Sequence, residues 1–296
     1  MKIVRTADVG LRTAGVDPTK IQQTIVVAGN YRCGTTWLAE MIVSTLPCYA
    51  LAFEPLRAYL GSIHDAGLVQ WRPYLTAETA TEAQRAVFTR VLDGTICRTD
   101  ALPRTDRRAV LDAHGLVVKF VRVLMSLRWL CDTYPIRHAF IVIRHPLSAI
   151  ASQVRKNAAP GTPQVYAELA DFARHHPEID VGGLVEPEEW LAMWWAASYY
   201  AALTTPKPHP WTLVRHEDLC ADAGAIQSQV FDVLDATPDV DVDELRLRPS
   251  MTSGDWSIPG TITPWHGVLT AHQARRVLDV VARFGNVFDD FYEDLT

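Results

Sequence analysis

The chain has 296 residues, of which 48% are hydrophobic, and a formal net charge of −6 at pH 7. This length suits one large α/β domain, and the negative charge argues against general binding to nucleic acid. No apolar run is long enough for a membrane span, and the N-terminus lacks the apolar stretch typical of a signal peptide. Five scattered cysteines without C-x-x-C spacing favour a reducing compartment, so we expect a cytoplasmic protein without a bound metal.

Strand-like and helix-like segments alternate along the chain. The strand candidates are Thr24–Ala28, Tyr49–Phe53, Leu116–Val121, His138–Ile143 and Trp211–Arg215. Several are short apolar runs without alternation, as in strands buried on both faces. The helix candidates are Thr36–Thr45, Glu78–Gly94, Leu124–Thr133, Pro146–Lys156, Glu186–Leu203, Ile226–Asp235 and Thr270–Phe284. This order predicts a three-layer α/β sandwich, with a central parallel sheet flanked by helices.

Two stretches rich in proline and glycine fit neither pattern, namely Asn157–Glu189 and Arg248–Gly267. Long irregular segments in a compact domain are often lids or binding loops, although ordinary surface connections are an equal alternative.

The stretch "VVAGNYRCGTTWL" (Val26–Leu38) joins the first strand to the first long helix. Gly29 and Gly34 have the spacing of a phosphate-binding P-loop, but Thr35 occupies the position of its lysine. Backbone N–H groups at a helix start attract anions, and Arg32 adds a cation that can bind a phosphate through two hydrogen bonds. Without that lysine, hydrolysis of a nucleoside triphosphate is not favoured. A plain turn rich in small residues remains the simplest alternative.

A second candidate anion site lies in "FIVIRHPLSAIASQ", which also runs from a strand into a helix. Arg144 ends the strand, and Ser152 lies about two turns into the helix that Pro146 begins. Arginine at the edge of a sheet and serine on a helix can hold one phosphate from two sides. A surface ion pair and a serine packed between helices are the alternative.

The two motifs together resemble those of the PAPS-dependent sulfotransferases, which have a P-loop NTPase-like fold. "YRCGTTW" resembles the family's 5′-phosphosulfate loop, and "RHPLSAIAS" resembles its 3′-phosphate motif. Weaker likenesses are "LVRHEDL" (Leu213–Leu219) and "SGDW" (Ser253–Trp256). The resemblance spans most of the chain and implies a single domain over residues 1–296, with substrate-facing insertions at about 56–112 and 157–189.

The resemblance implies a role for each matching residue. The 5′-phosphosulfate of PAPS would be held by Arg32, Cys33, Gly34, Thr35 and Thr36, with Trp37 against the adenine, and the 3′-phosphate by Arg144 and Ser152.

Two departures from the family pattern affect the donor site. Cys33 stands where the family usually has serine and is a weaker hydrogen-bond donor. The family's arginine before G-D-W is out of register, with Arg246 and Arg248 nearby.

Transfer of a sulfuryl group needs cations near the developing charge and a base for the acceptor hydroxyl. Arg32 and Lys119 are the candidate cations, although Lys119 could equally be a strand-end lysine that reaches water. Glu54, in "YALAFEPLR", is the candidate base, because apolar neighbours can raise the pKa of a carboxyl group. A salt bridge with Arg57 is its alternative, and His64, His114 and His145 are further candidates for the base.

The other conspicuous histidines and aromatic residues do not indicate a functional site. The pair His175–His176 lacks partner spacing for a metal site, and the aromatic residues of 190–199 have the helical spacing of a buried core.

These expectations point to a sulfotransferase that uses PAPS, needs no metal and modifies a hydroxyl of a carbohydrate, glycolipid or secondary metabolite. A segment resembling F-E-P-L in carbohydrate-modifying members favours a sugar. Two alternatives remain open from the residues alone: a P-loop kinase that uses ATP and magnesium, and a nucleotide-binding module without catalysis. Neither the oligomeric state nor the position of modification is indicated.

Overall fold

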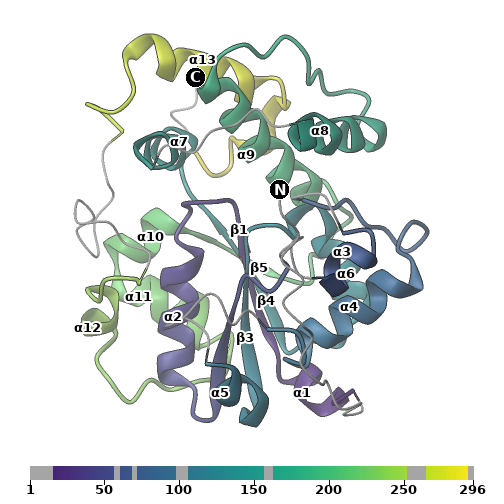
Figure 1. Cartoon of the computed structure of the whole chain (residues 1–296). Coiled ribbons are helices and arrows are strands. Elements are labelled where there is room, and N and C mark those ends of the chain that lie inside the picture. The colour runs from purple at the N-terminus through teal and green to yellow at the C-terminus, as the bar shows by residue number, and fades with distance from the viewer. Residues whose placement is uncertain are drawn as a thin grey trace.

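Five strands form one parallel sheet in the order β2-β3-β1-β4-β5. The computed structural model describes residues 16–56, 61–68, 72–97, 106–156, 163–251 and 265–292, with the backbone alone for 163–167. Each neighbouring pair of strands runs parallel, and Figure 1 shows the strands passing through the middle of the molecule between helices. The strands are β1 (Ile25–Gly29), β2 (Tyr49–Phe53), β3 (Gly115–Phe120), β4 (His138–Ile143) and β5 (Thr212–Arg215).

Both faces of the sheet are covered, which confirms the predicted three-layer arrangement. Every residue of β1 and β3 is buried, as expected for strands without alternating polarity. Successive residues pack into two separate apolar cores: Val26 and Ala28 join one core, whereas Ile25 and Val27 join the other.

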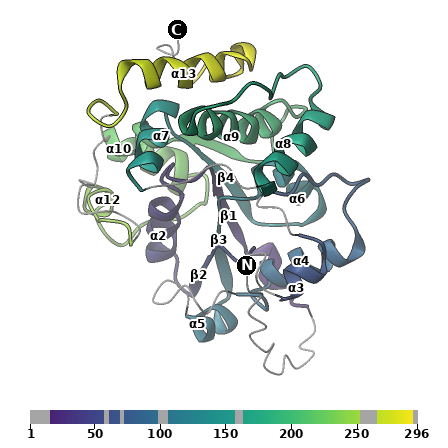
Figure 2. The same cartoon turned by 45° about the horizontal axis from the view of Figure 1, so that its top comes forward.

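The smaller core lies under α2 (Thr35–Thr45), α10 (His216–Ala221), α11 (Ala223–Ile226), the π-helical turn η2 (Gln227–Phe231) and α12 (Val242–Arg246). The larger core contains residues of α1 (Pro18–Gln22), α3 (Gly61–Asp65), α4 (Glu82–Leu92), α5 (Arg107–Asp112), η1 (Leu124–Ser126), α6 (Leu127–Thr133), α7 (Pro146–Arg155), α8 (Pro163–His175), α9 (Pro187–Leu203), α13 (Ala271–Ala282) and η3 (Gly285–Phe288). Figure 2 shows α7, α8, α9 and α13 gathered on this side of the sheet.

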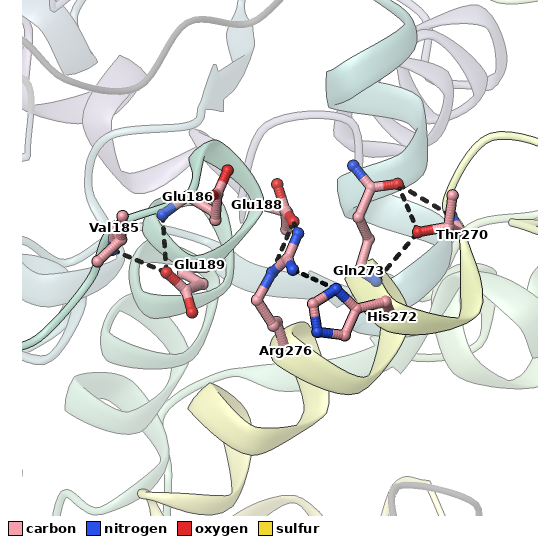
Figure 3. Close-up of polar contacts among 8 residues, drawn as sticks. All are labelled: Val185, Glu186, Glu188, Glu189, Thr270, His272, Gln273 and Arg276. Atoms are coloured by element: carbon pink, nitrogen blue, oxygen red, sulfur yellow. Dashed lines mark hydrogen bonds and ion pairs between the residues drawn. The ribbon is translucent and has the colours of Figure 1, made fainter.

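Helices α9 and α13 are joined where α9 begins. Arg276 of α13 donates from Nε to the buried carboxylate of Glu188 at 2.9 Å, and its Nη1 lies 2.6 Å from His272 Nδ1. Next to this pair, Glu189 Oε2 accepts the backbone N–H of Glu186 at 2.7 Å, which closes the first turn of α9 (Figure 3). The pair fixes α13 against the start of α9.

The sequence placed all five strands to within one residue, but three other assignments need correction. Residues Asn157–Glu189 are not an irregular stretch, because α8 occupies thirteen of them and buries Leu169 and Phe172. The helix predicted at Glu78–Gly94 begins later, because a capping box starts it at Thr81. The segment Ile226–Asp235 contains a π-helical turn rather than a continuous α-helix. Most of the second irregular stretch, 252–264, lies outside the described residues.

Among the described helices, none has the length and apolar character that a bilayer span requires.

Candidate functional site

The candidate residues from both motifs lie at one edge of the sheet. Because all five strands are parallel, their carboxyl ends lie together, which is where ligands bind in open α/β sheets. The loop 30–34 follows β1, and Glu54 follows β2. Lys119 is the penultimate residue of β3, Arg144 follows β4, and His216 follows β5. Residues separated by up to 186 positions in the sequence are thereby brought to the same edge.

The loop after β1 leaves the start of α2 open to an anion. Gly34 is the N-cap of α2 with a left-handed φ of 92°, and no side chain caps the helix. The first N–H groups of α2 therefore have no acceptor within the helix, and they lie at the positive end of its dipole. Two other residues at this edge also have a positive φ, which is 67° at Arg32 and 47° at Glu54. Strained backbone of this kind gathers at binding sites.

Gly29 at the end of β1 and Gly34 in the loop are both required by close packing. A Cβ on Gly29 would lie 2.6 Å from Thr35 Cγ2 and 2.6 Å from the carbonyl oxygen of Val142. A Cβ on Gly34 would lie 2.5 Å from Nδ1 of His216. The loop is thus held tightly between β4 and the start of α10, a packing that leaves no space for a larger residue.

The two sequence motifs meet through Arg32. Its Nε donates to Ser152 Oγ at 3.1 Å, and Arg144 Nη1 donates to the carbonyl oxygen of Arg32 at 3.1 Å. Arg144 is buried, and its Nε has no hydrogen-bond partner among the described residues. Burial lowers the pKa of Arg32, and the charge of Arg144 acts in the same direction. Two guanidinium groups and one hydroxyl therefore converge, and an anion bound there would relieve the repulsion between the cations.

The remaining residues of the first motif differ in burial and in the groups that they could present to a ligand. Cys33 is fully buried, and burial raises the pKa of its thiol to about 11, so the side chain stays neutral in the interior. Its N–H donates to the Asn30 carbonyl oxygen at 3.2 Å. Thr35 and Thr36 are buried in the first turn of α2, and half-buried Trp37 meets the ring of His216 edge-on, with 5.6 Å between centroids.

Glu54 and Lys119 form a buried ion pair. Lys119 Nζ donates to Glu54 Oε1 at 2.5 Å, and the Glu54 N–H donates to the carbonyl oxygen of Lys119. Both side chains are about 5% exposed. Burial alone would raise the pKa of the Glu54 carboxyl, but the charges of Lys119 and Arg122 outweigh it and lower that pKa. The expectation of a raised pKa, based on apolar neighbours, is therefore wrong in direction. Glu54 Oε2 has no hydrogen-bond partner among the described residues.

The three histidines that are alternative candidates for the base lie in different environments from Glu54. His64 lies 3.7 Å from Asp65 on α3, and His114 is exposed. His145 is the N-cap of α7 and accepts the N–H of Leu147 through its ring.

The nearby cations and the histidine pair are engaged elsewhere. Arg246 pairs with Asp243 at 2.9 Å and Arg248 with Glu244 at 2.8 Å, while Ser253–Trp256 lies outside the described residues. His176 lies 2.9 Å from the hydroxyl of Tyr74. In the described part of the chain, no group of three or more His, Cys, Asp or Glu side chains could hold a metal ion.

Helix α9 supports both candidate anion-binding segments, a role that sequence reasoning missed. Trp195 Nε1 donates to the carbonyl oxygen of Arg144 at 3.1 Å. The hydroxyl of Tyr199 accepts the Asn30 N–H at 3.0 Å and donates to the Val142 carbonyl oxygen at 2.6 Å. Both aromatic rings are fully buried, so their assignment to the core is confirmed. Helical spacing indicated burial, but no local pattern indicated which carbonyl groups these side chains bind.

The chain resembles sulfotransferase domains of solved structure. One is the sulfotransferase domain from the Synechococcus PCC 7002 olefin synthase, with 17% identity and a TM-score of 0.45 over 88% of this chain and 94% of that chain. Another is the sulfotransferase domain from the curacin biosynthetic pathway, with 16% identity and a TM-score of 0.41 over 87% of this chain and 97% of that chain. No protein-family model matches the chain, and a comparison with curated proteins gives no match.

Proposed function

We propose that this protein transfers a sulfuryl group from PAPS to a hydroxyl group of its acceptor and releases adenosine 3′,5′-bisphosphate. The observation that supports this proposal most directly is the convergence of Arg32, Arg144 and Ser152 beside the uncapped start of α2. PAPS carries anionic groups at both its 5′ and 3′ positions. Two adjacent anion-binding segments suit such a donor better than they suit one phosphate.

The donor would lie along the carboxyl edge of β1 and β4. The 5′-phosphosulfate would accept hydrogen bonds from Arg32 and from the N–H groups that follow Gly34, and the 3′-phosphate from Arg144 and Ser152. Thr35 and Thr36 would add hydroxyl donors at the same helix start. Cys33 would contribute less than a serine, because its thiol is buried and neutral. Trp37 would contact the adenine.

The reaction would be an in-line displacement at sulfur. The acceptor oxygen forms a bond to sulfur while the bond from sulfur to the bridging oxygen of the phosphate breaks, and the hydroxyl proton passes to Glu54. The lowered pKa keeps Glu54 ionised, which is the state a base needs, although it makes the carboxylate a weaker base. Lys119 and Arg32 would stabilise the charge on the moving oxygens.

The acceptor class is proposed as a carbohydrate, glycolipid or secondary metabolite. Residues 1–296 would form one domain in which the segments at about 56–112 and 157–189 face the acceptor. We place the reaction in the cytoplasm, on the ground that all five cysteines are free thiols.

The test is calorimetric titration with adenosine 3′,5′-bisphosphate and, separately, with ATP and magnesium. We expect the bisphosphate to bind far more tightly than ATP. Replacing Arg144 by Gln should weaken bisphosphate binding by about 10- to 100-fold, because a hydrogen bond between two charged groups is lost. The matched control is Arg128→Gln, which removes a partly exposed arginine paired with Asp132 on α6 and should leave binding unchanged. A preference for ATP, or equal affinity in the Arg144 variant, would count against the proposal.

A further inference from the structure

Arg72 is a buried arginine that neither motif contains, and it contacts the donor loop. It is 5% exposed, and its Nη2 lies 3.4 Å from Oδ1 of Asn30, the residue that directly follows β1. Its guanidinium carbon lies 4.8 Å from the ring centre of Trp194 on α9. Burial lowers the pKa of Arg72, and the negative charge of Glu168 opposes that shift. The charged form of this buried arginine is therefore stabilised by Glu168.

Asn30 determines how the loop leaves β1. Its Oδ1 accepts the N–H of Tyr31 at 2.7 Å, and its Nδ2 donates to the carbonyl oxygen of Trp194 at 3.2 Å. Its backbone N–H is held by the hydroxyl of Tyr199. Asn30 is 1% exposed, so these hydrogen bonds are screened little by water. Arg72 therefore holds the side chain that fixes the first turn of the donor loop.

On its other side Arg72 is held by Glu168 of α8. The backbone N–H of Arg72 donates to Glu168 Oε1 at 3.1 Å, and Nη1 lies 3.8 Å from Oε2. Glu168 is 1% exposed. One carboxylate thus contacts both the backbone and the guanidinium group of Arg72. Arg72 belongs to the segment 56–112 and Glu168 to the segment 157–189, so the two segments proposed to face the acceptor meet at this pair.

We propose that Arg72 is a positioning residue that links both acceptor-facing segments to the donor loop, so that the arrangement of these segments sets the affinity for the donor. The naming of donor and acceptor rests on the proposed function, whereas the link itself rests on the contacts of Arg72. The planar guanidinium group suits this role, because it can face Glu168, Asn30 and the Trp194 ring at once, which a lysine ammonium cannot do.

Glu168→Gln tests the link, and Glu188→Gln is its matched control. Glu188 is also a buried glutamate paired with an arginine, Arg276, and it also joins two helices (Figure 3). It lies six residues before Trp194 on α9, roughly 9 Å along the helix axis. Both substitutions remove the charge of a buried carboxylate that pairs with an arginine, but only Glu168→Gln releases a group that touches the donor loop. Arg72→Lys keeps the charge and removes the planar group.

Two measurements are made on each variant: hydrogen exchange of the backbone amides of residues 30–36, and calorimetric titration with adenosine 3′,5′-bisphosphate. We expect Glu168→Gln and Arg72→Lys each to speed exchange in the loop and to weaken bisphosphate binding by about tenfold. Glu188→Gln should leave both quantities at the wild-type level. The variant that carries both substitutions should bind the bisphosphate no more weakly than the single variant with the lower affinity. The two residues act through one contact, so their effects should not add.

The inference is overturned if loop exchange is unchanged in the Glu168 variant, or if the Glu188 variant speeds it equally. It is also overturned if Arg72→Lys retains wild-type exchange, since the planar group would then be unnecessary. If the wild-type protein does not bind the bisphosphate, the proposed function fails, while the exchange data still decide whether Arg72 holds the loop.

Discussion

His216 gives a prediction about the stability of the folded protein at acidic pH. Its ring lies against Gly34 and Trp37, and its Nε2 is 3.5 Å from Sγ of Cys220. Burial and the charge of Arg144 lower the pKa of this histidine to about 3. The folded protein therefore holds His216 neutral throughout the physiological range.

The sign of the effect follows from which state binds the proton first. In the unfolded chain the histidine has a pKa of 6.5, so on acidification the unfolded state is protonated long before the folded state. Stability should fall between pH 6.5 and about 3, and this contribution should level off below that range. At pH 5 the protonated form of His216 outnumbers the neutral form by roughly 30 to 1 in the unfolded chain. The unfolding free energy at pH 5 should therefore be lower than at pH 7 by up to about 2 kcal/mol.

The assay is urea denaturation of the wild-type protein and of His216→Gln at pH 7 and pH 5. His138 and His176 also have pKa values that burial lowers, so the wild-type protein alone would not isolate His216. The variant should lose less unfolding free energy between pH 7 and pH 5 than the wild type, by up to about 2 kcal/mol. Equal losses in the two proteins would show that the ring of His216 is not held neutral by its surroundings.

Three further predictions concern single substitutions at the site. Gly34→Ala should destabilise the protein by about 1–3 kcal/mol or more in urea unfolding, because the new Cβ meets His216 and φ is positive; wild-type stability would refute this packing. Glu54→Gln should lower the unfolding free energy by about 3–5 kcal/mol, since Lys119 would lose its buried carboxylate; a loss below 1 kcal/mol would mean that the pair is solvated. Ser152→Ala should weaken calorimetric bisphosphate binding by about tenfold, and no change would remove Ser152 from the donor site.

The sheet was predictable because its strands are encoded locally. The predicted limits of β2 and β4 are the observed ones, since each is a short apolar run bounded by residues that end strands. Helix α8 was missed because the prolines and glycines around it were interpreted as a continuous irregular segment. Phe172 of this helix packs against the rings of Tyr200 on α9 and of Phe284, contacts that no local pattern reveals.

The candidate site was predictable only where the position of a residue in the fold follows from its place in a strand-to-helix turn. Arg32 and Arg144 lie in recognisable strand-to-helix turns, and the parallel sheet then places those turns together. The state of Glu54 was not predictable in this way. Its pKa depends on Lys119 and Arg122, which are brought to it by the pairing of β2 with β3. Arg72 was missed for the same reason, because its partners come from three separate segments.

The hydroxyl of Tyr199 bridges backbone groups at the ends of two neighbouring strands. The pairing of β1 with β4 ends at Gly29 and Val142, and there this one oxygen binds the N–H of Asn30 and the carbonyl of Val142. The strands can therefore separate without leaving either backbone group unpaired in the interior. The spacing of the turns that follow β1 and β4 therefore depends on a tyrosine of α9, a helix that belongs to neither strand.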